Sequence, residues 1–395
     1  MQLDSVVILG GKRTAIGSFG GSLAGLAPHE MGTATAKAAL SEAGVAASDI
    51  DHAVYGHIIT TGPADAYLAR HIALESGVPS SAGAFNVNRL CGSGVQAVVS
   101  AAQQIAMGAS QLALAGGAES MSRGGYLLPA AARFGIRMGD APITDLTLGT
   151  LSDPFDSGHM GVTAENIAQR YELSREELDA FALASHQKAA RAIAAGRFDS
   201  QITPLKVRKG RNEVIFRHDE HVREVITPED LARLKPAFKK DGVVTAGNAS
   251  GINDAAATLV LAHADAAKQR GLEPRARLRT AAIAGVEPNV MGLGPTPAVR
   301  RCLKQAKLNI EDIDVIESNE AFAAQAIAVA RDLGFPDERL NPNGGAVGLG
   351  HPVGATGAIL IIKALHELER TAGRFGLITL CIGGGQGIAL LIERL

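Results

Sequence analysis

The sequence predicts an α/β protein that contains two copies of one structural unit and a loop-rich segment inserted into the chain. Three observations predict it. Short β-branched apolar runs alternate with helix-length apolar runs, which is typical of a mainly parallel sheet covered by helices. This alternation stops after Ser120 and resumes at Val243. The turn, helix, glycine and strand that follow Cys91 also recur in the same order after His351.

The first 120 residues contain the first set of alternating elements. A strand is predicted at residues 5–9, and the glycine-rich residues 10–21 are predicted to form a loop. Pro28 and Gly44 favour a helix between them, because proline suits the first turn of a helix and glycine suits its end. The remaining expected elements are strands at 51–55, 84–87 and 111–115 and helices at 63–75 and 95–107.

The segment after Ser120 has a different composition. Residues 123–159 mix Gly, Pro, Arg and Asp without periodicity, and residues 203–240 are charged and contain three prolines. Residues 162–194 between them predict one or two helices, with Ser174 and Glu177 in a capping-box pattern. We therefore expect an inserted domain at 121–247, an N-terminal half at 1–120 plus 248–270, and a C-terminal half at 271–395.

The C-terminal half repeats the pattern of the first. Asp49-Ile50-Asp51 has a counterpart in Asp312-Ile313-Asp314, and the later unit predicts a helix over 354–369 and a strand over 375–381. Cys91 and His351 occupy equivalent positions in the two copies, where a loop enters a buried helix. If the two halves pack about a pseudo-two-fold axis, these two residues converge.

Composition excludes several classes of function. The formal net charge of −2 over 395 residues gives no basic field that would favour nucleic acid. No apolar run is long enough to span a membrane, and the N-terminus lacks the features of a signal peptide, so we expect a cytoplasmic protein. The three cysteines form no CxxC pair, and His218 and His221 have no further ligand nearby in the sequence, so no metal is expected. Motifs for dinucleotides and for nucleoside triphosphates are also absent, so these classes of function lose their usual sequence support.

Reactive side chains gather in four short stretches at the ends of predicted strands or starts of predicted helices. Cys91 precedes a helix, whose N-terminal N–H groups favour a thiolate, so we interpret Cys91 as a nucleophile. A buried cysteine is more often a packing residue, and that is our interpretation of Cys302. Glu320 is left outside the chemistry. The four stretches are Asn88–Gly94, Glu317–Phe322, Asn343–Pro352 and Cys381–Gly387.

These stretches, together with Gly247–Asp254, resemble the motifs of the thiolase family in the same order and over essentially the whole chain. The resemblance implies a layered αβαβα fold with duplicated halves and an inserted loop domain. It is strongest to bacterial acetoacetyl-CoA thiolases and short-chain β-ketothiolases. It therefore implies an acyltransferase that condenses two acetyl-CoA molecules reversibly to acetoacetyl-CoA and CoA, or that cleaves short 3-ketoacyl-CoA substrates. Coenzyme A thioesters are then substrates, and no cofactor is needed.

The resemblance also assigns roles to residues of this sequence. Cys91 would carry the acyl group, His351 would be its base, and Cys381 would exchange the α-proton of the second substrate. His351 and a water held by Asn319 would form one oxyanion site, and the backbone N–H groups of Cys91 and Gly383 would form the other. The expected coenzyme A path is lined by Leu151, His159, Met160, Arg223 and Ser250, with Met291 and Phe322 closing the acyl pocket.

Alternative functions remain open at this point. A degradative 3-ketoacyl-CoA thiolase of fatty-acid β-oxidation, with longer substrates, is the main one, and the departures from the family pattern at Ser318 and Gly348 leave chain length undecided. A ketoacyl synthase would require a second histidine at the positions occupied here by Asn319 and Cys381. A non-catalytic lipid-carrying member of the fold would have lost a catalytic residue. We expect a homodimer or homotetramer, with residues 121–145 as a candidate tetramer loop.

Overall fold

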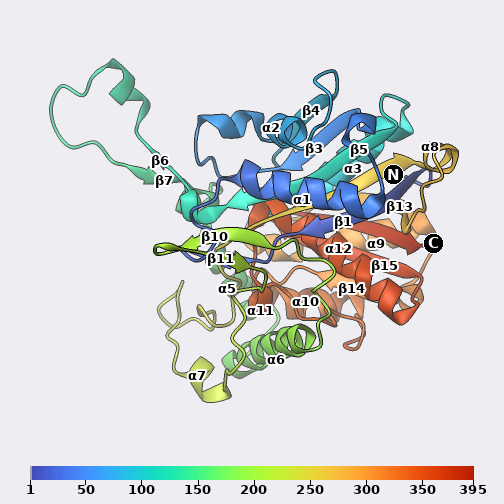
Figure 1. Ribbon diagram of the computed structural model, residues 1–395. Coiled ribbons are helices and arrows are strands. Elements are labelled where there is room, and N and C mark those ends of the chain that lie inside the picture. Colours follow the sequence, from blue (N-terminus) through green and yellow to red (C-terminus); the bar gives the residue numbers. More distant parts are fainter. Residues whose placement is uncertain (1) are drawn as a thin grey trace.

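One large mixed β-sheet runs through the molecule, as the computed structural model in Figure 1 shows for residues 2–395. In this described part of the chain the sheet has ten strands. In spatial order the strands are β14 (Val315–Ser318), β15 (Phe375–Ile382), β16 (Gln386–Arg394), β13 (Ala276–Gly285), β1 (Val6–Arg13), β12 (Asn253–His263), β5 (Leu112–Ser120), β3 (His52–Gly56) and β4 (Gly83–Val87), with β2 (Gly17–Ser18) paired to β12. Each half of the chain therefore supplies one side of the sheet, and β1 and β13 join the two sides.

Two details of the strand prediction are wrong. The sheet is not mainly parallel, because only β3 with β4 and β5, and β14 with β15, pair in parallel. The central strands run antiparallel: a tight turn reverses the chain between β15 and β16, and β12 enters between β1 and β5 only after the long insertion. Residues 10–13 also belong to β1 rather than to a loop, since Gly10 and Gly11 pair with Val260 and Leu259.

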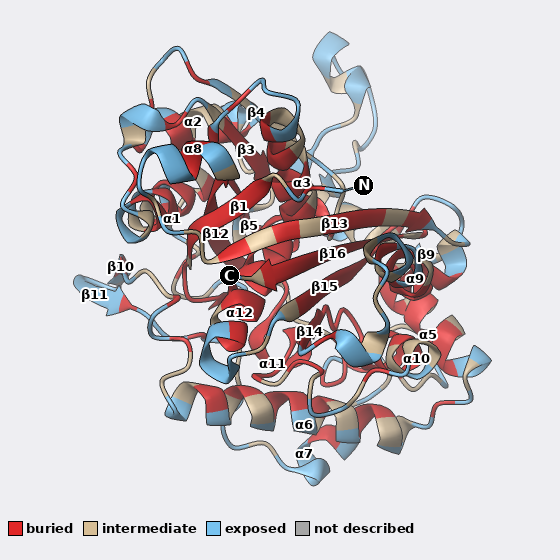
Figure 2. Cartoon of the chain, turned by 90° about the vertical axis from the view of Figure 1, so that its right-hand side faces the viewer, coloured by how far each residue is buried: buried red, intermediate tan, exposed pale blue. Residues whose placement is uncertain are grey.

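The helices form one middle layer between the two sides of the sheet and two outer layers. Along β1, Val6 and Ile8 pack toward the cluster that contains α3 and α12, whereas Val7 and Leu9 pack toward α1, because alternate side chains of a strand point to opposite faces. Helices α3 (Ser93–Ala106) and α12 (Val353–Thr371) pack together in the middle layer. The outer layers contain α1 (Pro28–Ala43), α2 (Leu68–Glu75), α8 (Ala264–Gln269), α9 (Pro295–Ala306) and α10 (Ala323–Leu333). This is the expected αβαβα layering, and Figure 2 shows the buried strands between helices with exposed outer faces.

Helix ends follow the local signals in the sequence. Helix α1 begins at Pro28 and is closed by Gly44 in the left-handed conformation, as predicted. The hydroxyl of Ser174 accepts a hydrogen bond from the Glu177 N–H and begins the longest helix, α6 (Arg175–Ala194). Among residues 2–395, no helix combines the length and apolar character needed to cross a membrane. Short 3-10 helices complete the connections: η1 (Ala47–Asp49), η2 (Pro63–Tyr67), η3 (Met121–Arg123), η4 (Ala130–Phe134), η5 (Pro288–Leu293) and η6 (Ile310–Asp312).

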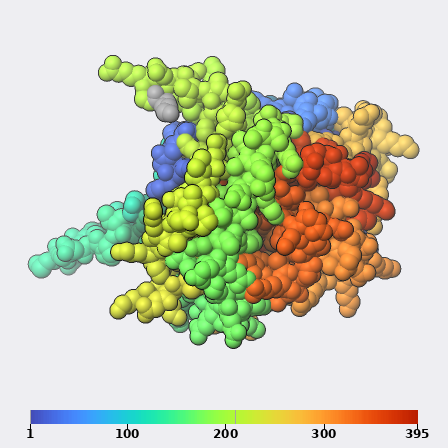
Figure 3. Space-filling model, turned by 90° about the horizontal axis from the view of Figure 1, so that it is seen from below, coloured from blue at the N-terminus to red at the C-terminus, as the bar shows by residue number. Residues whose placement is uncertain are grey.

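The inserted segment covers one face of the molecule, and residues 128–143 form a long arm that extends away from it (Figure 1). It contains α6, α4 (Leu146–Thr150), α5 (Met160–Arg170) and α7 (Pro228–Ala232), and the hairpins β6 (Tyr126–Leu127) with β7 (Thr144–Asp145), β8 (Ser152–Asp153) with β9 (Gly158–His159), and β10 (Leu205–Lys209) with β11 (Asn212–Phe216). The arm beyond β6 and β7 projects from the body in Figures 1 and 3. Phe134 and Met138 in this arm are 86% and 95% exposed. The division of the chain into two halves and an insertion stays our proposal, and the position of β12 between β1 and β5 supports it.

Candidate active site

Cys91 and His351 line one cavity of about 60 Å³ between the two halves of the chain. A wider cavity of about 340 Å³ adjoins it and shares Leu151, His159, Ser250, Phe322 and His351 with it. The arrangement is a narrow inner chamber at the cysteine with a broader outer chamber beside it. Of the predicted site residues, the inner cavity brings together Cys91, Leu151, His159, Met160, Ser250, Met291, Phe322, His351 and Gly383.

The close crossing of α3 and α12 explains why Cys91 and His351 meet. Each residue lies in the loop that leads into one of these two helices. A Cβ atom on Gly94 would lie 2.6 Å from the backbone nitrogen of Ala358, and one on Gly357 would lie 2.4 Å from that of Val95. Only glycine at both positions lets the helix backbones come this close, and the crossing brings the preceding loops to the same cavity.

The environment of Cys91 does not produce the thiolate that its position before a helix predicts. Burial raises the pKa of the Cys91 thiol to about 11, although hydrogen bonds from the backbone N–H groups of Gly383 and of Cys91 itself act in the opposite direction. The cysteine remains partly exposed to the cavity. The thiol is therefore protonated at neutral pH and needs a base. The same contacts show that two backbone N–H groups point at the sulfur.

His351 has the tautomer and charge that a base for this thiol requires. The Thr356 hydroxyl donates its single proton to Pro352 O over 2.8 Å, so it accepts a hydrogen bond from Nδ1–H of His351 over 2.7 Å. Nε2 is then unprotonated and accepts from Nδ2 of Asn319 over 3.4 Å. Burial lowers the pKa of His351 to about 4, which keeps the ring neutral.

Three predicted site residues do not line the cavities. Asn319 is buried behind His351, and its Oδ1 finds no hydrogen-bond partner within residues 2–395. Cys381 is fully buried in the apolar cluster that includes Met160 and Phe322, and burial and the neighbouring Cys91 both raise the pKa of its thiol. Arg223 is exposed, and its backbone N–H donates to Nδ1 of His186 over 3.2 Å.

Comparison with known proteins identifies the family. A family model described as the thiolase N-terminal domain matches residues 6–265, and one described as the thiolase C-terminal domain matches residues 272–394. The chain belongs to the thiolase family. Its relatives include a beta-ketothiolase, BktB, of Cupriavidus necator, which is 54% identical over 99% of each chain. An acetyl-CoA acetyltransferase of Pseudomonas aeruginosa is 48% identical over 99% of this chain and 100% of that protein.

Solved structures agree with this assignment. The acetyl-CoA acetyltransferase of Bacillus anthracis superimposes with a TM-score of 0.97 and 45% identity, and the match covers 100% of both chains. Human mitochondrial 3-ketoacyl-CoA thiolase in complex with CoA gives a TM-score of 0.97 at 40% identity, covering 100% of this chain and 99% of that one. The resemblance and the fold class predicted from the sequence are confirmed.

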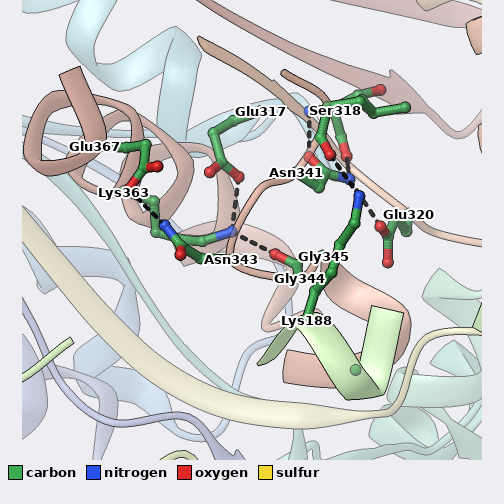
Figure 4. Close-up of polar contacts among 12 residues, drawn as sticks. Lys188, Glu317, Ser318, Glu320, Asn341, Asn343, Gly344, Gly345, Lys363 and Glu367 are labelled. Atoms are coloured by element: carbon green, nitrogen blue, oxygen red, sulfur yellow. Dashed lines mark hydrogen bonds and ion pairs between the residues drawn. The ribbon is translucent and has the colours of Figure 1, made fainter. Parts of the chain in front are cut away.

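Glu320 connects the two loops that carry Asn319 and His351 in this thiolase. Figure 4 shows its contact with Asn341. Its Oε1 accepts a hydrogen bond from Asn341 Nδ2 over 2.7 Å. Its Oε2 accepts from the Ser185 hydroxyl over 2.6 Å and from the Val347 N–H over 3.1 Å. Val347 lies in the short helix α11 (Ala346–Leu349), which ends immediately before the Gly350–His351 turn. The carboxylate that follows Asn319 in the chain thus also binds the helix that leads to His351.

Further hydrogen bonds complete this clamp, which we define as Ser185, Glu320 and Asn341. Asn341 accepts from the Ser318 N–H over 2.9 Å and donates to Ser318 O over 2.9 Å, so it holds the end of β14 on both sides. The Ser185 hydroxyl oxygen also accepts from the N–H groups of Gly345 and Gly348, each over 3.2 Å. The role of Glu320 was not visible in the sequence, because its partners Ser185 and Asn341 lie 135 and 21 residues away along the chain.

A buried ion pair lies beside the clamp, as Figure 4 also shows. Lys363 Nζ lies 2.7 Å from Glu317 Oε2 and donates to Gly344 O over 2.7 Å. Both side chains are almost fully buried, at 1% and 0% exposure. Lys363 of α12 therefore connects β14, which ends just before Asn319, to the loop that precedes His351.

A second buried charged group is formed by His57, Asp65 and Glu119. Burial lowers the pKa of His57, but the carboxylates of Asp65 and Glu119, at 3.4 and 3.2 Å from its ring nitrogens, outweigh burial and raise it to about 10. Glu119 accepts backbone N–H groups from Ile59 over 3.1 Å and from Gly354, at the start of α12, over 3.0 Å. The charged His57 ring thus holds a carboxylate that ties β5 to the helix that follows His351.

Proposed function

We propose that this thiolase is an acyltransferase that joins two acetyl-CoA molecules reversibly to acetoacetyl-CoA and free CoA through an acyl group on Cys91. The names of its relatives, acetyl-CoA acetyltransferase and beta-ketothiolase, support this reaction. The observation that carries the mechanism is the small cavity that Cys91 and His351 both line, with Nε2 of His351 unprotonated and two backbone N–H groups at the cysteine sulfur.

The first step forms the acyl-enzyme. His351 Nε2 takes the proton of the Cys91 thiol, and the sulfur attacks the carbonyl carbon of the first acetyl-CoA. The backbone N–H groups of Cys91 and Gly383 hold the negative oxygen of the tetrahedral intermediate, and the loss of one such donor typically costs about 10²–10³ in rate. The carbon–sulfur bond to CoA then breaks. The leaving CoA thiolate takes a proton from Cys381, so His351 keeps its own.

The second step forms the carbon–carbon bond. The Cys381 thiolate removes an α-proton from the second acetyl-CoA, and its raised pKa makes it a stronger base for this task. Protonated His351 and a water held by Asn319 stabilise the enolate oxygen, and the unpartnered, buried Oδ1 of Asn319 supports a bound water there. The enolate carbon attacks the acetyl carbonyl, Cys91 leaves as a thiolate, and His351 returns its proton to it.

The outer cavity provides the proposed coenzyme A path. Leu151, His159 and Ser250 line both cavities, so a pantetheine arm in the outer chamber would reach the sulfur of Cys91. Met160 and Met291 with Phe322 surround the inner chamber with apolar groups. The exposed guanidinium of Arg223 lies outside both chambers and would meet the nucleotide end of the coenzyme.

The assembly state and the location in the cell stay predictions. We propose a homodimer or homotetramer, and the exposed apolar side chains of the arm at 121–145 support a contact between copies. Gel filtration with light scattering measures the mass directly. The proposed location is the cytoplasm.

The size of the inner chamber favours short acyl groups over the alternative of a longer-chain 3-ketoacyl-CoA thiolase. Thiolysis of a series of 3-ketoacyl-CoA substrates with increasing chain length tests this choice. We expect acetoacetyl-CoA to be cleaved efficiently and the rate to fall as the chain lengthens. Cys91→Ala should abolish cleavage of every substrate, and full activity in that variant would overturn the mechanism.

A further inference from the structure

A second group of potential ligand side chains lies between α1 and α2, away from the catalytic cavity. His29 comes from the first turn of α1, and His71 and Glu75 come from one face of α2. One ligand atom of each residue lies within 4.8 Å of the others. The two imidazole rings stack with centroids 4.0 Å apart and an angle of 18° between their planes. None of the three residues lines either cavity at Cys91.

Tight packing of the two helices fixes this group. A Cβ atom on Gly32 would lie 2.3 Å from Cδ1 of Ile72, so glycine is what lets α1 and α2 approach at this point. His29 lies one turn before Gly32, and His71 directly precedes Ile72. The close contact therefore brings the two histidines together. It does so on a helix pair that packs into the core through Met31 and Ile72.

Glu75 is oriented by a residue of the opposite helix. The Thr33 hydroxyl donates to Glu75 Oε2 over 3.0 Å, and Glu75 Oε1 lies 3.2 Å from His71 Nε2. A threonine hydroxyl that holds the far oxygen of a carboxylate is the kind of outer contact that orients a metal ligand. The nearer oxygen and the His71 nitrogen already have the separation of about 3.3 Å that two ligands of a tetrahedral ion with bonds of about 2.0 Å require.

We propose that His29, His71 and Glu75 bind one divalent transition-metal ion of the zinc class, with water completing the coordination. Two imidazoles and one carboxylate suit zinc, cobalt or nickel rather than calcium or magnesium, which prefer oxygen ligands. The His71–Glu75 pair already has the required separation, and a ring nitrogen of His29 lies within 4.8 Å of the ligand atoms of the other two residues. His29 and His71 are partly exposed and Glu75 is exposed, which gives an ion and its water access.

The bound ion would cross-link the helices that begin the N-terminal half. Helix α2 leads through β4 to the Cys91 loop, so the ion would stabilise the part of the fold on which the nucleophile loop rests. It would act on stability and not on the chemistry. The sequence alone predicted no metal, and it gave no sign of this group, since His29 is far from His71 in the chain and Glu75 has an ordinary helix spacing from His71.

Cobalt provides a direct test because Co²⁺ in a site with nitrogen ligands absorbs visible light. The wild type and Cys91→Ser, each freed of metal by a chelator, are titrated with Co²⁺ and then with Zn²⁺. We expect about one Co²⁺ per chain in both proteins, displacement by Zn²⁺, and a Tm that rises by about 2–5 °C with saturating Zn²⁺. His29→Ala and His71→Ala should each lower the affinity by about 10–100-fold and abolish the Tm rise.

His263→Ala is the matched control, because His263 also lies near an acidic group, Asp265, at 3.8 Å but has no third ligand in the described residues. It should bind Co²⁺ like the wild type. Metal-free His29→Ala and His71→Ala should cleave acetoacetyl-CoA at the wild-type rate, which shows that they are folded. Absence of Co²⁺ binding to the wild type at about 1 mM, or equal affinity in His29→Ala and His71→Ala, would overturn the proposal.

Discussion

Replacing Glu320 by glutamine tests whether the clamp sets the geometry of the catalytic pair. Glu320 accepts three hydrogen bonds, from Asn341, Ser185 and Val347. Glutamine has one oxygen and one NH₂ group, so its NH₂ group must face either the Asn341 amide donor or the Val347 N–H. A buried donor left without an acceptor costs about 1–3 kcal/mol. We expect the free energy of unfolding of Glu320→Gln to fall by this amount.

The effect on catalysis should exceed the effect on folding. The two loops joined by Glu320 set the 3.4 Å separation between Asn319 Nδ2 and His351 Nε2. A displacement of about 1 Å at a reacting group can cost about 10²-fold in rate. We therefore expect kcat for acetoacetyl-CoA thiolysis to fall by about 10–100-fold, with little change in the KM for CoA.

Steady-state kinetics, with urea unfolding as a measure of stability, provides the assay. Glu338→Gln is the matched control, since Glu338 and Glu320 both line a separate cavity of about 430 Å³ beside the clamp, but Glu338 is exposed. It should retain wild-type kcat and stability. A folded Glu320→Gln protein with kcat within about threefold of the wild type would refute the positioning role, because a displacement of His351 relative to Asn319 should lower kcat by at least about tenfold.

Three further predictions concern buried ionisable groups. Lys363→Met should lower the free energy of unfolding, measured in urea, by about 3–5 kcal/mol, because it leaves Glu317 buried without its cation. Adding Glu317→Gln to the same chain should recover most of this loss. A cost of Lys363→Met alone below about 1 kcal/mol would contradict the prediction. The pKa of His57 is raised from 6.5 to about 10, so its contribution to stability is complete below pH 6.5 and is lost as pH rises toward 10. Unfolding free energy should fall there by up to about 1.4 kcal/mol per pH unit, and His57→Gln should flatten this slope. The pKa of Cys91 is about 11 and that of His351 about 4, so the thiol is protonated between pH 6 and 9 and the reactive thiolate fraction rises with pH. The rate of Cys91 alkylation by iodoacetamide should therefore rise by up to about tenfold per pH unit in this range. A rate that stops rising below pH 7 would instead indicate a preformed thiolate.

Sequence signals were sufficient where a local residue decides the local structure. Pro28 and Gly44 mark both ends of α1, and Ser174 marks the start of α6. The repeat also predicted that Cys91 and His351 would approach each other, and the structure places both on one cavity. These features depend on short-range turn chemistry or on internal symmetry, both of which are visible in a single chain.

Features that depend on distant packing were not predictable. Gly10 and Gly11 resemble loop residues, yet they pair with β12, which follows only after the long insertion. The thiolate expected at Cys91 is opposed by burial that the helix N-terminus does not offset. Glu320 and Ser185 form a hydrogen bond although they are 135 residues apart in the sequence, and no local sequence pattern predicts such a contact.

The central claim, that Cys91 carries the acyl group while Cys381 exchanges the α-proton, can be tested by mass spectrometry of proteins mixed with acetyl-CoA. The Cys381→Ala variant cannot take the α-proton, so it should accumulate one acetyl group per chain on the peptide that contains Cys91 and form no acetoacetyl-CoA. Cys91→Ala should acquire no acetyl group at all. An acetyl group on Cys381, or acetoacetyl-CoA formation by Cys381→Ala at the wild-type rate, would contradict the account.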